Sequence, residues 1–113
     1  MALRHIVLFG FKAGVDEAGG TEVARRLAAL RDEVPGIDDF EWGVNCSPEG
    51  KSHGLTHCFT LTFGSAEARD VYLVHPAHVA FAQWVGAFVE IVTVVDYWTT
   101  RSEERRVGKE CSS

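Results

Sequence analysis

The stretch HIVLFGF at residues 5–11 constrains the fold more than any other part of the sequence. In an extended strand successive side chains point to opposite faces, so His5 and Val7 share one face. Ile6 and Leu8 share the other. Because both faces carry large apolar residues, we predict a strand that is covered on both sides.

The rest of the chain alternates between helical and extended patterns. The first expected helix begins at Asp16 or Thr21 and ends at Pro35, and two strands are expected after it, at residues 39–45 and 55–63. A second helix follows Ser65 and stops before Pro76. A third helix begins at Pro76 with Phe81, Val85 and Phe88 as its apolar stripe, and a strand at residues 90–98 comes last. Counting the two last helices as one broken helix, the order is βαββαβ. This order predicts an α+β, ferredoxin-like sandwich with one antiparallel sheet and its helices on one face.

Such a sheet leaves its second face without cover from its own chain. We expect Ile6, Leu8, Val92 and Val94 on that face. An apolar sheet face is not left in water, so we predict a homodimer whose two sheets face each other, a dimeric α+β barrel.

Composition limits the classes of function. The 113 residues carry a net charge of -5 without a basic cluster in the body of the chain, which argues against a nucleic-acid partner. No apolar run has the length of a membrane span. The three cysteines, Cys46, Cys58 and Cys111, form neither a disulfide framework nor a zinc motif. We therefore expect a reduced, cytoplasmic protein.

The C-terminal residues differ in character from the rest. Residues 101–113, RSEERRVGKECSS, are charged, lack an apolar period and resemble a translated sequencing adapter. We predict one domain over residues 1–100 and a disordered tail over residues 101–113.

Two strand histidines, His5 and His57, are candidates for a functional site. A single histidine on an apolar face is usually a packed core residue. Two on one face of neighbouring strands favour water or a ligand between sheet and helices, because histidine is costly to bury.

The stretch YLVHPAHVAF at residues 72–81 adds Tyr72, His75 and His78. One interpretation is a plain helix start, with His75 as the cap and His78 exposed. The other places His78 in the first helical turn, where the partial positive charge of the amides keeps it neutral and able to act as a general base. No carboxylate or cysteine stands at a ligand spacing beside these histidines, so we predict no metal and no cofactor.

Several segments together resemble a known family. RHIVLFGFK, VPGI, EWGVNCSPEG, GLTHCFTLTF and YLVHPAHVAF, in this order, resemble the stress-responsive A/B barrel domain (Dabb) family from about Arg4 to Tyr97. The resemblance implies a dimeric, ferredoxin-like α+β barrel. One enzyme of this family closes a linear polyketide by a cofactor-free intramolecular aldol condensation.

The resemblance also implies roles for individual residues. His78 would remove a proton next to a carbonyl, Tyr72 would donate to the developing oxyanion, and His5 and His57 would orient the substrate. The expected substrate-binding residues are Val7, Val23, Leu27, His75 and Trp84. Two other functions remain open at this point: a non-enzymatic stress-response or ligand-binding dimer, and a cofactorless monooxygenase with the same type of barrel.

Overall fold

A computed structural model describes residues 1–100 of the chain; the predicted tail at residues 101–113 lies outside them. The elements are β1 (Leu3–Phe11), α1 (Glu17–Glu33), β2 (Ile37–Val44), β3 (His57–Phe63), α2 (Ala66–Val74), α3 (Pro76–Val85) and β4 (Val89–Trp98). The order confirms the predicted βαββαβ arrangement with its second helix broken in two. The fold is ferredoxin-like.

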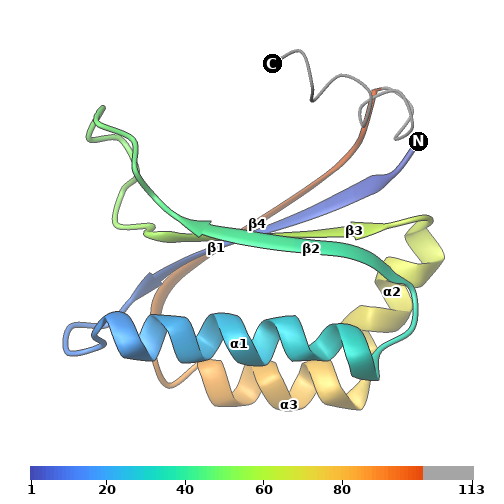
Figure 1. Cartoon of the computed structure of the whole chain (residues 1–113), viewed down its shortest axis with the longest axis horizontal. Coiled ribbons are helices and arrows are strands. Elements are labelled where there is room, and N and C mark those ends of the chain that lie inside the picture. The colour runs from blue at the N-terminus through green and yellow to red at the C-terminus, as the bar shows by residue number, and fades with distance from the viewer. Residues whose placement is uncertain (101–113) are drawn as a thin grey trace.

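The four strands form one antiparallel sheet in the order β2-β3-β1-β4. Strand β1 is therefore central, and Val7 pairs with Phe59 of β3 on one side and with Val94 of β4 on the other. The helices α1, α2 and α3 lie on the same side of the sheet, and within residues 1–100 no helix covers the opposite side (Figure 1). The face of β1 that bears His5 and Val7 is the helix-covered one.

Capping decides where α1 begins. Asp16, not Thr21, is the N-cap, and its carboxylate accepts a hydrogen bond of 2.8 Å from the Gly19 amide. At the other end, Pro35 cannot continue the helix. Gly36 then adopts φ of +95°, a conformation that suits glycine, and turns the chain into β2.

A proline separates the two shorter helices as predicted. Ser65 caps α2 through the Ala68 amide at 3.1 Å, and Pro76 takes the first position of α3. The expected apolar stripe was one residue too long: α3 ends at Val85, before the weak helix former Gly86, so Phe88 lies in the following turn.

The core fills the space between the sheet and the helices. Leu27 and Leu30 of α1 meet Phe59, Leu61 and Phe63 of β3, and all five are at most 4% exposed. Burying each such side chain stabilises the fold by about 1.5–3 kcal/mol. This core lies between α1 and the middle of the sheet, and β4 at the sheet edge is much less covered.

The register of β4 corrects one expectation. Val92 pairs with Phe9 and Val94 pairs with Val7, so both valines lie on the helix side of the sheet and not on its bare face. The bare face instead receives the residues of opposite parity, among them Ile91 and Val95. The expectation failed because β4 carries apolar residues on both faces, so alternation alone does not show which face meets the helices.

Candidate active site between the sheet and the broken helix

A cavity of about 730 Å³ lies between the helix side of β1 and β4 and the helices α2 and α3. Its apolar wall includes Val7, Phe9, Phe81, Val85, Val92 and Val94. Val92 and Val94 remain 55% and 53% exposed, so the cavity is open along the edge strand. Polar side chains gather at one part of the wall: His5, Tyr72 and His78, with Arg69, Asp70 and Asp96 beside them.

Tyr72 and His78 stand next to each other in this cavity. The break at Pro76 lets the last turn of α2 and the first turn of α3 present one ring each, with centroids 4.4 Å apart. The ring of His5 on β1 lies 5.9 Å from that of Tyr72. Three of the four residues expected to form the site therefore converge.

The backbone fixes the tautomer of His78. Its Nδ1 lies 3.0 Å from the carbonyl oxygen of Leu73. A carbonyl can only accept, so Nδ1 carries the proton and Nε2 keeps its lone pair. Desolvation lowers the pKa of His78 below its ordinary value of 6.5, more than the Leu73 bond raises it. Neutral His78 thus offers a basic nitrogen.

The hydroxyl of Tyr72 is available to a ligand. The side chain is 2% exposed, yet among residues 1–100 its oxygen has no hydrogen-bond partner and is not sealed off from solvent. The hydroxyl therefore opens onto the cavity that Tyr72 lines. Burial raises the pKa of Tyr72 well above its ordinary value of 10.0, so the hydroxyl stays protonated and can donate.

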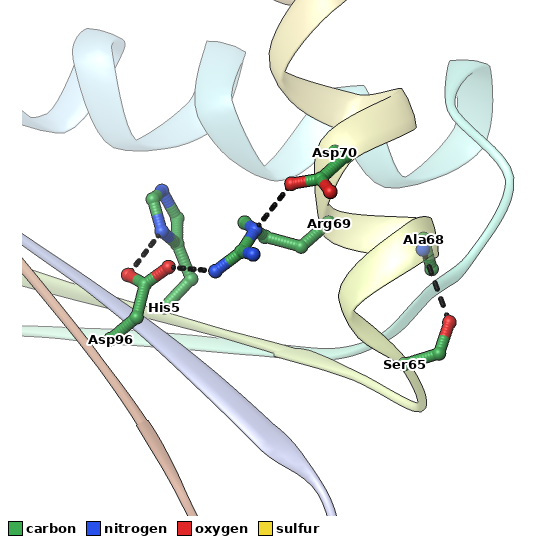
Figure 2. A network of polar contacts seen from close by, with 6 residues as sticks. All are labelled: His5, Ser65, Ala68, Arg69, Asp70 and Asp96. Atoms are coloured by element: carbon green, nitrogen blue, oxygen red, sulfur yellow. Dashed lines mark hydrogen bonds and ion pairs between the residues drawn. The ribbon is translucent and has the colours of Figure 1, made fainter.

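A carboxylate holds His5 in the same tautomer as His78. The Nδ1 atom of His5 donates to Asp96 Oδ1 at 2.7 Å, and the other oxygen of Asp96 accepts from Arg69 at 2.7 Å (Figure 2). Arg69 in turn donates to Asp70 at 2.8 Å. Sequence reasoning missed Asp96 and Arg69. The signal for Asp96 lay in the pairing of β1 with β4, which places it directly opposite His5.

The structure does not bring His57 to this cavity. His57 shares the helix side of the sheet with His5, but β1 pairs with β3 so that the two lie four residues apart along the strands, roughly 13 Å. Its ring stacks on Trp42 with centroids 6.1 Å apart and meets Phe11 edge-on at 4.9 Å. His57 thus belongs to an aromatic cluster at the other end of the sheet.

The expected substrate-binding residues also divide. Val7 and Leu27 line the cavity. Val23 is buried in the core, and Trp84 packs beneath the guanidinium of Arg26 at 4.2 Å. His75 caps α3, because its Nδ1 accepts from the Ala77 amide at 3.0 Å. The plain-helix-start interpretation thus holds for His75 and fails for His78, whose ring lines the cavity and is only half-exposed.

The arrangement is suited to acid–base chemistry. A basic nitrogen and a hydroxyl donor face one cavity at neighbouring positions, a combination that serves proton removal beside a carbonyl. Within residues 1–100, no group of three or more His, Cys, Asp or Glu side chains is placed to hold a metal ion. No helix of that part of the chain is long and apolar enough to cross a membrane.

Residues 3–99 match the stress responsive A/B barrel domain family. The chain is 33% identical over 97 residues to olivetolic acid cyclase of Cannabis sativa, covering 86% of this chain and 96% of that protein. It is 37% identical over 98 residues to the stress-response A/B barrel domain-containing protein HS1 of Arabidopsis thaliana, covering 87% and 90% of the two chains.

Solved structures agree with these sequence matches. A crystal structure of an Arabidopsis thaliana protein aligns with a TM-score of 0.84 at 36% identity, covering 89% of this chain and 98% of that one. A protein from Jannaschia sp. CCS1, described as dimeric and ferredoxin-like, aligns with a TM-score of 0.76 at 28% identity, covering 88% of this chain and 100% of that one.

Proposed function

The chain belongs to the stress-responsive A/B barrel domain family, and we propose that it is a cofactor-independent, polyketide-cyclase-like enzyme that acts on a small carbonyl compound. The observation that carries the proposal is the pairing of His78 and Tyr72, whose ring centroids lie 4.4 Å apart in an apolar cavity. The 33% identity with a cyclase supports the same reaction class.

The reaction we propose is an intramolecular aldol addition, the ring-closing step of an aldol condensation. Nε2 of His78 takes a proton from a carbon that lies between two carbonyls, and the electron pair left behind forms an enolate. The Tyr72 hydroxyl donates a hydrogen bond to the enolate oxygen, where negative charge develops. The enolate carbon then bonds to another carbonyl carbon of the same molecule, and the oxygen of that carbonyl takes the proton back from His78.

Matched variants test this assignment. Linear β-polyketide thioesters are incubated with wild-type protein, His78→Ala and Tyr72→Phe, and the cyclised isomer is separated by liquid chromatography and identified by mass spectrometry. Loss of a general base or an oxyanion donor typically costs about 10²–10⁴-fold in rate. Equal turnover by wild type and His78→Ala would remove His78 as the base, and binding without turnover would make the protein a ligand carrier.

The functional unit is a homodimer in this proposal. The bare side of the sheet presents Ile6, Leu8, Ile91 and Val95, and the last two are 40% and 52% exposed. A row of apolar residues of this kind favours cover by a partner. The description of the 28% identical Jannaschia protein as dimeric supports the same arrangement.

A further inference from the structure

The charged residues of the cavity indicate which ligands it accepts. Four charged side chains line it: Arg69, Asp70, Glu90 and Asp96. Asp70 and Glu90 are exposed and stand at the rim, whereas Arg69 and Asp96 have side chains only 23% and 24% exposed. The question is whether any of these charges is left for a ligand.

The single positive charge is already compensated. The guanidinium of Arg69 donates to Asp96 at 2.7 Å and to Asp70 at 2.8 Å, as Figure 2 shows. The bond to Asp96 is the main reason that the pKa of Arg69 is raised. A ligand carboxylate would share the guanidinium with two carboxylates that already offset its charge, and would therefore gain little net attraction. It would also pass two rim carboxylates that repel it.

The half-buried negative charge is compensated as well. One oxygen of Asp96 accepts from His5 and the other from Arg69. An ammonium group that entered the apolar part of the cavity would lose its water without gaining a free carboxylate, which is costly. Two neutral polar groups remain for a ligand: the Tyr72 hydroxyl and the Nε2 atom of His78.

We infer that the cavity selects an uncharged molecule that joins a hydrogen-bonding head, such as a ketone, amide or thioester, to an apolar chain. The head lies among His5, Tyr72 and His78, and the chain follows Val7, Phe81 and Val85. This inference rests on the proposed function, because it names the substrate class of the same cavity. It adds that a free carboxylate at the reacting end is excluded.

Three probes of equal chain length test the inference by binding alone: nonanamide, nonanoate and nonylamine at pH 7.5. Titrations are followed by amide NMR shifts of the residues that line the cavity. We expect nonanamide to bind at least about tenfold more tightly than either ion, which corresponds to a difference in binding free energy of about 1.4 kcal/mol. An ion that binds as tightly as the amide, or no cavity shifts with any probe at millimolar concentration, would overturn the inference.

Charge variants then test whether the rim carboxylates cause the preference for nonanamide over nonanoate. Removing both rim charges with Asp70→Asn and Glu90→Gln should narrow the gap between nonanamide and nonanoate by threefold or more, about the effect of removing repulsion between screened charges. The matched control is Glu67→Gln, which removes an exposed charge of α2 that does not line the cavity. An unchanged gap in the double variant would show that the rim does not select.

The binding experiment and the turnover experiment can fail independently of each other. Amide-selective binding together with equal turnover by wild type and His78→Ala would leave the ligand class standing and refute the proposed catalysis. Turnover that depends on His78 with tighter binding of nonanoate would do the reverse.

Discussion

Nδ1 of His78 donates its proton to the carbonyl oxygen of Leu73 at 3.0 Å, across the break between α2 and α3. This bond ties the proposed general base to the last turn of the preceding helix, on which Tyr72 also stands. The proline that breaks the helix therefore positions the side chains of Tyr72 and His78 relative to each other. Both histidines of the YLVHPAHVAF stretch take part in this geometry. His75 caps α3, and His78 bonds back to the last turn of α2 across the break.

The pH dependence of the proposed reaction follows from these two groups. Desolvation lowers the pKa of His78 below 6.5, and burial raises the pKa of Tyr72 well above 10.0. We expect kcat/KM to rise with pH through a midpoint below 6.5 and then stay level across neutral and mildly alkaline pH. A profile with its acid midpoint above 6.5 would contradict His78 as the base in this environment.

Stability should depend on pH in the same range. The pKa values of His57 and His78 are lowered in the folded state, chiefly by desolvation, so the unfolded chain binds more protons near pH 6.5. The free energy of unfolding therefore rises with pH through this region, and stability is lost as pH falls below 6.5. Urea titrations between pH 5 and pH 8 measure the effect. Substituting both residues, as in His57→Gln/His78→Gln, should flatten the slope.

Asp96→Asn should impair catalysis more than folding. The substitution keeps the shape of the side chain but removes the charge that holds the Nδ1 proton of His5 and pairs with Arg69. We expect a rate loss of about tenfold or more, with a stability loss on the order of 1 kcal/mol. Glu67→Gln is the matched control, because Glu67 is an exposed carboxylate of α2 that does not line the cavity. An equal rate loss in both variants would argue against a role through His5.

The homodimer can be tested on the bare face of the sheet. Leu8→Glu places a charge among its apolar residues and should shift the protein from dimer to folded monomer in light scattering at micromolar concentration. Ala80→Glu places the same charge on an exposed position of α3, on the other side of the sheet, and should leave the dimer intact. A wild-type protein that is a stable monomer would refute the homodimer outright.

Local chemistry was enough to predict the order of elements. The cap at Ser65, the break at Pro76 and the turn at Gly36 are all fixed by residues close in sequence. The register between strands that are far apart in sequence could not be predicted from local residues. Hence the sequence indicated that His5 and His57 share a face but not that register keeps them far apart, and it gave no sign that Asp96 stands opposite His5.

We predict that His57 has a packing role in the aromatic cluster beside α1. Its ring stacks on Trp42, meets Phe11 edge-on and lies against the backbone of α1 at Gly20. A Cβ atom at Gly20 would stand 2.8 Å from Nε2 of His57, closer than such atoms approach in proteins. Because the two aromatic rings leave the imidazole little room to move, Gly20→Ala should destabilise the fold by about 1–3 kcal/mol.

That loss would oppose the usual effect of the substitution. Alanine in a helix interior is normally about 1 kcal/mol more stable than glycine, so only a steric conflict reverses the sign. Combining Gly20→Ala with His57→Ala removes the conflict, and urea denaturation of the four proteins in this cycle gives the coupling energy. A stabilising Gly20→Ala, or a coupling energy near zero, would show that His57 yields easily. His57 would then not be the residue that requires glycine in the first turns of α1.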